Sequence, residues 1–255
     1  MILHEESIWG GFRGDIAVKT VVVIPTYNEA GNLAELLSQI QALGVSGLTV
    51  LIVDDNSPDG TGQIAEQWAE KHPGWLHVMH RKGKLGLASA YVTGFHQALG
   101  MGAEAVIQMD ADLSHDPHAI PVFLEAIERA DLVIGSRYIP GGQIDSSWSL
   151  SRRLLSAWSN YYARSVTGVH VKDITSGYRC FRAALLRQIT LRSIRSNGFV
   201  FQVEMALASR ALGARLTEIS ITFRERNLGR SKMSFRIILE AAVRVWQLRR
   251  IYRQP

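Results

Sequence analysis

The sequence predicts an α/β protein with a mostly parallel sheet flanked by helices. Short β-branched and aliphatic runs alternate with stretches whose apolar residues recur at helical spacing, and polar loops separate the two kinds of segment. No window reaches the roughly 20 apolar residues that a membrane-spanning helix needs. With 255 residues and 47% hydrophobic content, the chain is long enough to bury one large core.

The strands are predicted from apolar runs bounded by turn residues. The first run is typical of a buried parallel strand and stops at Pro25, which cannot donate to a ladder. The predicted strands are residues 20–24, 48–53, 76–80, 105–109, 131–135 and 216–223.

The helices are predicted where apolar residues return every three or four positions. They are residues 33–43, a helix through Ile64 and Trp68, a helix through Leu87, Tyr91 and Phe95, a helix that begins near Arg152 and contains Trp158, and residues 235–252. The last helix is amphipathic, and its predicted apolar side is Phe235, Ile238, Leu239, Ala242 and Trp246. Either this side lies on an anionic membrane surface, or it packs against the domain while the basic side faces water.

Acidic and polar side chains follow three of the strands at the point where each ends. They are Tyr27, Glu29, Asp54, Asp55, Asp110 and Asp112. The carboxyl ends of parallel strands form the edge where such sheets bind ligands. Two carboxylates as close as Asp110 and Asp112 repel each other and favour a hard divalent cation, whose shell is completed by water and substrate phosphates. The alternative is that this pair only caps the following helix.

Charge and motif content exclude several classes. A net charge of +5 and a pI near 9.5 indicate an anionic partner, which is a nucleic acid, a phospholipid head group or a phosphorylated substrate. No Gly-x-Gly-x-x-Gly follows the first strand and no P-loop motif occurs, which disfavours dinucleotide oxidoreductases and P-loop NTPases. The single cysteine, Cys180, is expected in the core and agrees with a reducing compartment. Residues 1–19 have no apolar signal-peptide region and are expected to form an N-terminal arm.

Several short motifs occur in a characteristic order along the chain. They cover residues 24–29, 53–60, 84–87, 109–115, 135–138, 173–179, 198–202 and 229–232. In these motifs the chain resembles family 2 glycosyltransferases of the GT-A fold, with its Rossmann-like sheet. More narrowly, it resembles the branch formed by dolichyl-phosphate mannose synthase catalytic subunits and their archaeal and bacterial polyprenyl-phosphate relatives. The resemblance covers about 21–234 and implies a catalytic domain over 20–234, followed by a C-terminal amphipathic helix over 235–255.

The resemblance also implies site residues. The expected donor-binding residues are Pro25, Tyr27, Glu29, Val53, Asp55, Asp110, Ala111, Asp112, Arg226 and Lys232. Asp110 and Asp112 are expected to bind Mg²⁺ or Mn²⁺, together with Ser114, which stands where some members have Gln. Asp112 and Arg137 are the expected catalytic residues. Because arginine forks suit phosphate oxygens, Arg137 and one of Arg152 or Arg153 are predicted to receive the acceptor phosphate, unless the latter two only form a solvated helix face.

The implied reaction is mannose transfer from GDP-mannose to dolichyl or another polyprenyl monophosphate, by an inverting, metal-dependent displacement that gives a β-linked product. A phosphate monoester with a second pKa of about 6 is largely dianionic at neutral pH, so no strong general base is needed. The alternatives are a UDP-glucose or UDP-amino sugar donor and, from charge alone, a nucleic-acid-binding protein. We expect no nucleic-acid partner. The enzyme is expected at the cytoplasmic face of a membrane, bound peripherally or through a separate anchoring subunit.

Overall fold

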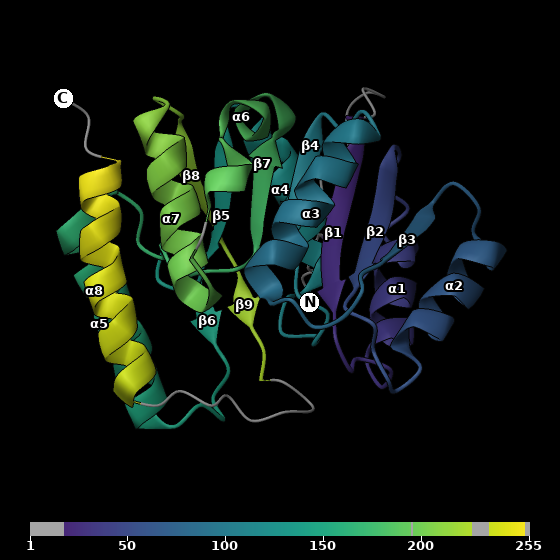
Figure 1. The fold of residues 1–255 in the computed structure, drawn as a ribbon, viewed down its shortest axis with the longest axis horizontal. Helices are drawn as coiled ribbons and strands as arrows, with labels where there is room; N and C mark the ends of the chain where they lie inside the picture. The colour runs from purple at the N-terminus through teal and green to yellow at the C-terminus, as the bar shows by residue number, and fades with distance from the viewer. Residues whose placement is uncertain (1–17, 195, 226–234, 253–255) are drawn as a thin grey trace, which may run out of the picture.

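A seven-stranded sheet forms the centre of the protein. The computed structural model describes residues 18–194, 196–225 and 235–252. The strand order is β3-β2-β1-β4-β7-β5-β8, with helices on both faces (Figure 1). The strands are β1 (Thr20–Thr26), β2 (Leu48–Asp54), β3 (Leu76–His80), β4 (Ala105–Gln108), β5 (Leu132–Ser136), β7 (Arg179–Arg182) and β8 (Leu216–Ser220). Within the described residues, β7 alone runs antiparallel to its sheet neighbours. The predicted α/β class with a mostly parallel sheet is confirmed.

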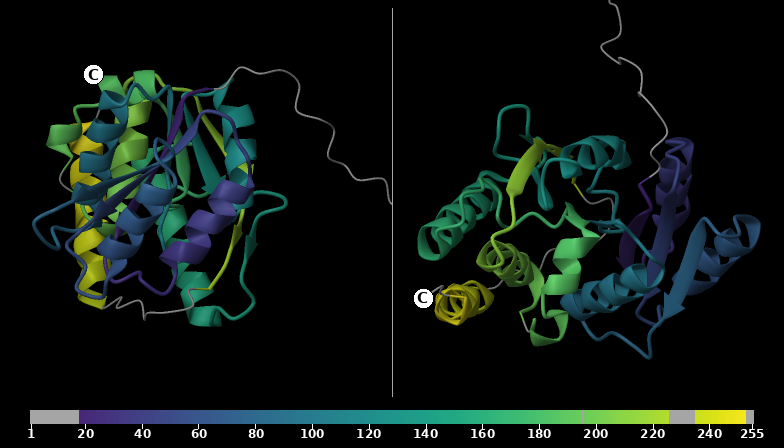
Figure 2. Two further views of the ribbon diagram at one scale, coloured as in Figure 1. Left: turned by 90° about the vertical axis from the view of Figure 1, so that its right-hand side faces the viewer. Right: turned by 90° about the horizontal axis from the view of Figure 1, so that it is seen from above.

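Helices cover the sheet in two layers, which Figure 2 shows edge-on. They are α1 (Leu33–Ala42), α2 (Thr61–Lys71), α3 (Leu87–Gly100), α4 (Ile120–Ile127), α5 (Leu150–Thr167), α6 (Ala183–Gln188), α7 (Gly198–Ala211) and α8 (Phe235–Ile251). One apolar cluster joins the sheet to α3, α5, α6, α7 and α8. A second cluster joins the opposite face to α1, α2 and α4. The sheet is therefore buried on both faces, which explains why its strands are continuous apolar runs.

The strand order reverses direction at β1. The chain adds β2 and β3 on one side of β1 and then crosses to β4 on the other side. All pairs among these four strands are parallel. In open α/β sheets, the crevice outside the carboxyl ends of the strands at such a reversal is where ligands bind. The fold thus brings the ends of β1, β2 and β4 to one place.

The predicted bounds of β2, β4 and β5 differ from the structure by one residue, and two further strand predictions are wrong. β1 does not stop at Pro25, because this residue pairs with Val53 and the next residue with Asp54. After Val23, β1 pairs with β2 and no longer with β4. The edge of β1 that faces β4 therefore needs no N–H donor at Pro25. The run predicted as one strand over 216–223 is two strands, since β9 (Thr222–Phe223) leaves the main sheet and pairs with β6 (Gln143–Ile144).

Helix α8 packs against α5 and α7, but not through the predicted side. Its buried residues are Ala241, Val245 and Leu248, whereas Trp246 is 48% exposed. The helix carries apolar residues on more than one side. The residues that contact α5 and α7 are aliphatic and smaller than Trp246. The side chains of 235–239 lie outside the described residues, and the boundary at 235 stays a prediction. Among the helices described, none is long and apolar enough to cross a bilayer.

Candidate active site

The paired carboxylates lie on a strained turn after β4. Asp110 is partly exposed and Asp112 is buried. The backbone reverses at Leu113, which has a positive φ of 62°, an unusual conformation for a bulky residue and one that is often found at functional sites. Ser114 holds the turn because its N–H and its hydroxyl both donate to Asp112 Oδ1, at 3.1 and 2.5 Å.

The pair does not cap the following helix. Asp116 supplies that cap, since its carboxylate accepts a hydrogen bond from the His118 N–H at 3.0 Å at the start of the 3₁₀ turn Pro117–Ala119. The alternative reading of Asp110 and Asp112 as helix caps is therefore wrong. These two carboxylates are left for another purpose.

Asp110 is held from two sides by buried aromatic rings. The hydroxyl of Tyr91, on α3, donates to Asp110 Oδ1 at 2.6 Å. Burial raises the pKa of Tyr91 well above its usual value, and the neighbouring charge of Asp110 adds to this, so the hydroxyl remains a donor. The Asp110 N–H donates to His115 Nδ1 at 3.0 Å, and the His115 ring stacks on Tyr178. His115 is a buried acceptor beneath the site.

A basic loop, residues 81–86, lies across the ends of β1 and β2. Lys84 Nζ lies 4.0 Å from the centroid of the Tyr27 ring. Asp55 Oδ2 accepts a hydrogen bond from the Leu85 N–H at 3.1 Å, and Asp55 Oδ1 lies 3.0 Å from Arg81 Nη1. This arrangement places an aromatic ring, a carboxylate and an ammonium group together, which suits the nucleoside and phosphate parts of a donor.

The other predicted donor residues of β1 and β2 are less available. The Glu29 carboxylate accepts from the Asn32 side chain at 2.8 Å, just ahead of α1. Pro25 and Val53 are buried within their strands, and Ala111 is 3% exposed. Backbone groups are therefore what Pro25, Val53 and Ala111 can offer a ligand. Arg226 and Lys232, predicted to close over the diphosphate, lie outside the described residues.

Arg137 forms a buried ion pair with Asp173. Its Nε and Nη2 donate to the two carboxylate oxygens at 2.7 and 2.8 Å, and Nη2 also donates to the Thr175 hydroxyl. Burial alone would raise the pKa of Asp173, but the charge and hydrogen bonds of Arg137 outweigh it and hold that pKa below its usual value. Both groups are charged at neutral pH. A phosphate arriving at Arg137 would therefore meet a guanidinium that already has a carboxylate partner.

Arg152 and Arg153, at the start of α5, also have partners. Arg152 Nη1 donates to both carboxylate oxygens of Glu225 at 2.7 Å, and its guanidinium lies over the Trp148 ring. Arg153 Nη2 donates to the carbonyls of Asp145 and Ser146 at 3.0 Å. The Arg152 contact joins α5 to the end of β9, and the Arg153 contacts join it to the residues that follow β6. Neither side chain is a purely solvated face, and the predicted role of both in phosphate binding stays a prediction.

Arg179 is a site-shaping residue that the sequence did not identify. Its side chain is fully buried and donates to the carbonyls of Ser176, Gln202 and Ile174 at 2.6–2.8 Å. Burial lowers its pKa to about 9, which leaves it cationic at neutral pH. The guanidinium thereby fixes the loop between Asp173 and β7 against α7. The available signal was an arginine between two apolar neighbours, Tyr178 and Cys180.

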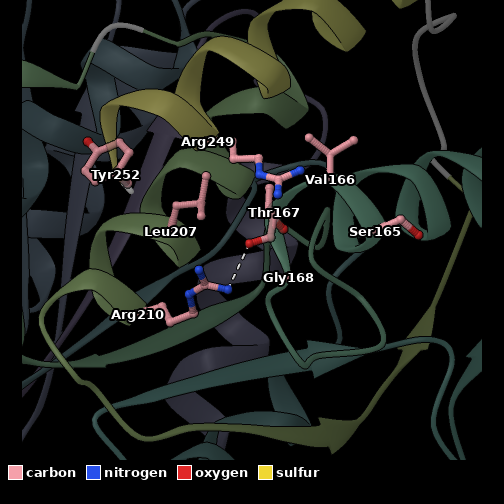
Figure 3. Close-up of a pocket in the computed structure, with 8 residues that line it drawn as sticks. All are labelled: Ser165, Val166, Thr167, Gly168, Leu207, Arg210, Arg249 and Tyr252. Carbon is pink, nitrogen blue, oxygen red and sulfur yellow. Dashed lines mark hydrogen bonds between the residues drawn. The ribbon is translucent and has the colours of Figure 1, made fainter. Parts of the chain in front are cut away.

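Two surface pockets lie among the described residues, and one of them adjoins this edge of the sheet. One, of about 520 Å³, is lined by residues 113 and 115–117 of the Asp-x-Asp loop and by Arg224 and Glu225. The other, of about 300 Å³, lies among α5, α7 and α8 and is lined by Arg210, Arg249 and Tyr252 (Figure 3). Figure 1 places the C-terminal end of α8 at the end of the sheet where β1 begins, away from the carboxylates. The second pocket contains none of the predicted site residues.

The paired carboxylates can hold a divalent cation with help from a substrate. Asp110 Oδ2 accepts no hydrogen bond from any described residue, so it faces a ligand freely. Within the described part of the chain, no group of three or more His, Cys, Asp or Glu side chains is arranged to hold a metal. Carboxylate oxygens alone, completed by water and phosphate, are the donor set that Mg²⁺ prefers. The residues present fit such an ion.

A mostly parallel sheet with paired carboxylates at its reversal point is the arrangement expected of a glycosyltransferase of the GT-A fold. The family model for glycosyl transferase family 2 matches residues 21–190, and the chain belongs to this family. It is 46% identical to an undecaprenyl-phosphate mannosyltransferase of Micrococcus luteus. The match covers 89% of this chain and 93% of that enzyme. It is 42% identical to a polyprenol monophosphomannose synthase of Mycolicibacterium smegmatis. The match covers 91% of this chain and 88% of that enzyme.

Solved structures share the fold at low sequence identity. Glucosyl-3-phosphoglycerate synthase from Mycobacterium tuberculosis, in complex with Mn²⁺, UDP-glucose and phosphoglyceric acid, superposes with a TM-score of 0.64 at 15% identity over 92% of this chain and 79% of its own. A mannosyltransferase from Pyrobaculum calidifontis, in complex with GDP-Man and Mn²⁺, superposes with a TM-score of 0.59 at 18% identity over 92% and 73%. These similarities confirm the GT-A fold.

Proposed function

We propose that the chain transfers mannose from GDP-mannose to a polyprenyl monophosphate such as dolichyl phosphate. The observation that carries this function is the identity of 46% and 42% to two enzymes named for mannose and a polyprenyl phosphate, over about nine-tenths of the chain. The site geometry supports the reaction type. A donor laid over Tyr27 and Lys84 would direct its diphosphate toward Asp110 and Asp112 along the edge formed by β2, β1 and β4.

The divalent ion is part of this proposal. When bound, Mg²⁺ or Mn²⁺ neutralises the charge that develops on the diphosphate leaving group. Asp110 and Asp112 would hold it, with the Ser114 hydroxyl engaged in fixing Asp112. Tyr91 keeps Asp110 oriented, which limits the reorganisation needed when a donor arrives.

The acceptor needs attraction more than activation. A dianionic lipid phosphate is already a nucleophile, so the site requires no strong base. Arg137 lies at the end of β5 with its Asp173 partner, and Arg152 lies at the start of α5, so the two guanidinium groups are the acceptor's proposed cationic partners. We expect one in-line displacement with inversion and a β-linked product. Detection of an α-linked product would contradict this stereochemistry.

Helix α5 offers a surface for the membrane that holds the acceptor. Four large apolar side chains lie along one side of it, at intervals of three or four residues: Leu150, Leu154, Trp158 and Tyr161, each 48–71% exposed. Such a stripe is unusual on a monomeric soluble surface and suits the boundary between acyl chains and head groups. The net charge of +5 favours anionic lipids. We propose that α5, beginning beside the acceptor-binding arginines, lies on the bilayer.

Replacing Leu154 or Trp158 with Glu is expected to weaken vesicle binding by about tenfold or more. Each change removes a side chain that would be buried in lipid, worth about 1.5–3 kcal/mol, and adds a charge. The measurement is flotation with phosphatidylglycerol-containing vesicles. Leu212→Glu, at another exposed leucine beyond α7, is the matched control and should bind as the wild type does. Equal binding by all variants would exclude α5 as the lipid contact.

The function is tested by supplying labelled GDP-mannose and, in parallel, UDP-glucose to a polyprenyl phosphate, with and without Mg²⁺ or Mn²⁺. Cation-dependent labelling of the lipid from GDP-mannose alone is the expected result. Labelling from UDP-glucose alone would replace the donor while leaving the reaction type. No labelling from either donor would contradict the proposed activity.

A further inference from the structure

One buried amide near Asp110, that of Gln202, has no hydrogen-bond partner for its oxygen among the described residues. Gln202, on α7, is 4% exposed, and its Oε1 accepts no hydrogen bond. Gln108, the last residue of β4, is also fully buried, and its side chain lies beside the Tyr91 hydroxyl. Buried polar groups are almost always paired, and an exception calls for a ligand, a water or a strain that explains it. The exception at Gln202 lies beside a candidate metal ligand, Asp110.

The backbone places both amides on the same side of the sheet. Gln108 lies directly opposite Arg179 in the antiparallel pair of β4 and β7, so their side chains share a face. The Arg179 guanidinium reaches the backbone carbonyl of Gln202 at 2.8 Å. Phe201, the residue before Gln202, stacks on the Tyr91 ring, whose hydroxyl holds Asp110. Residues from α3, β4, β7 and α7 thus converge behind the carboxylate.

The Gln202 amide and the Asp110 carboxylate face a common space at Gly177. The position that a Cβ atom would occupy on Gly177 is 3.6 Å from Asp110 Oδ2 and 3.6 Å from Gln202 Nε2. Asp110 Oδ1 is taken by Tyr91, so Oδ2 is the oxygen that shares this space. The oxygen and nitrogen of an amide exchange places by a simple flip, so either atom of Gln202 can face the ligand.

We propose that Gln202 is a further donor-site residue whose amide oxygen accepts a hydrogen bond from an O–H group held against Asp110. That group is a water bound to the divalent cation or a hydroxyl of the transferred sugar. The proposal rests on the proposed function. It accounts for an amide oxygen that is buried without a partner among the described residues.

The test is Gln202→Met, which keeps the length of the side chain and removes the amide. We expect the melting temperature to stay the same or rise, because a buried group without a partner is removed. We expect affinity for the donor with Mn²⁺, measured by calorimetry, to fall about tenfold, the loss of one buried hydrogen bond. Loss with both GDP and GDP-mannose assigns the O–H group to cation-bound water, and loss with GDP-mannose alone assigns it to the sugar.

Gln188→Met, at an exposed glutamine on α6, is the matched control and should change neither quantity. Wild-type affinity of Gln202→Met for both ligands would overturn the proposal. A lower melting temperature would also overturn it, because the amide would then be a structural group. UDP and UDP-glucose are titrated alongside, and whichever donor the wild type binds carries the comparison. A wrong donor would therefore contradict the proposed function and leave the result on Gln202 readable.

Discussion

Replacing Asp112 with Asn is expected to reduce mannosyl transfer on the order of 10³-fold while the protein stays folded. Asparagine keeps the Oδ1 acceptor that receives both hydrogen bonds from Ser114, so the turn at Leu113 is preserved. What disappears is the negative charge that a divalent cation needs. The measurement is the rate of lipid labelling, with Mn²⁺ affinity and the unfolding temperature recorded on the same preparation.

Asp116→Asn is the matched control for this loss. Asp116 lies four residues further along the same loop and pairs with Arg224, which is largely exposed. Asparagine caps helices as well as aspartate does, and an exposed ion pair contributes about 0–1 kcal/mol. Activity should stay within about twofold of the wild type. If Asp112→Asn instead keeps more than about a tenth of the activity, the metal role of the pair is refuted.

Arg137→Ala is expected to destabilise the protein by about 3–5 kcal/mol, the usual cost of removing one partner from a buried ion pair. Asp173 is fully buried and would be left with its charge uncompensated. Activity lost by Arg137→Ala therefore mixes unfolding with any loss of phosphate binding. Chemical denaturation measures the first contribution, and the Michaelis constant for polyprenyl phosphate measures the second at a temperature where the variant is folded.

Asp173→Asn separates the two roles of Arg137. It should also destabilise the protein, but it leaves the guanidinium with less competition, so the Michaelis constant for the acceptor should stay the same or fall. The pKa of Asp173 is lowered in the folded state, so its contribution to stability is present above the unfolded pKa of about 3.9 and disappears as the pH falls through the lowered value. Wild type and variant should thus converge in stability below that pH. A Michaelis constant that rises in both variants in proportion to lost stability would make the pair structural only.

Strands and their order in the sequence were predictable because the sheet is buried on both faces. β1 and β2 are β-branched and aliphatic runs that carry a strong signal whatever lies around them. β7 carries little signal, because it has four residues and an arginine at each end. α7 is buried from Val200 to Ser209 without interruption, so it has no polar face to reveal a helical period.

The positions of the acidic groups were predictable, and their partners were not. Asp110 and Asp112 follow directly after an apolar run, and this local pattern is enough to place them at the end of a strand. The pairing of Arg137 with Asp173 joins residues that are 36 positions apart. It depends on where the antiparallel strand β7 enters the sheet, which no local pattern encodes. Tyr91 illustrates the same limit, since its ring was expected on an apolar helix side and its hydroxyl reaches the end of β4.

The short strand β9 connects the loop that carries Asp110 and Asp112 to α5, the helix that we propose lies on the bilayer. On one side Phe223 bridges to His115, and the Arg224 N–H donates to the Ser114 carbonyl. On the other side β9 pairs with β6, and Glu225 binds Arg152 on α5. If α5 lies on a bilayer as proposed, β9 would fix the distance between the carboxylates and the lipid head groups. We then expect the enzyme to accept membrane-bound polyprenyl phosphates only when their phosphate lies at that distance. Short polyprenyl phosphates dispersed in water would not be subject to this requirement.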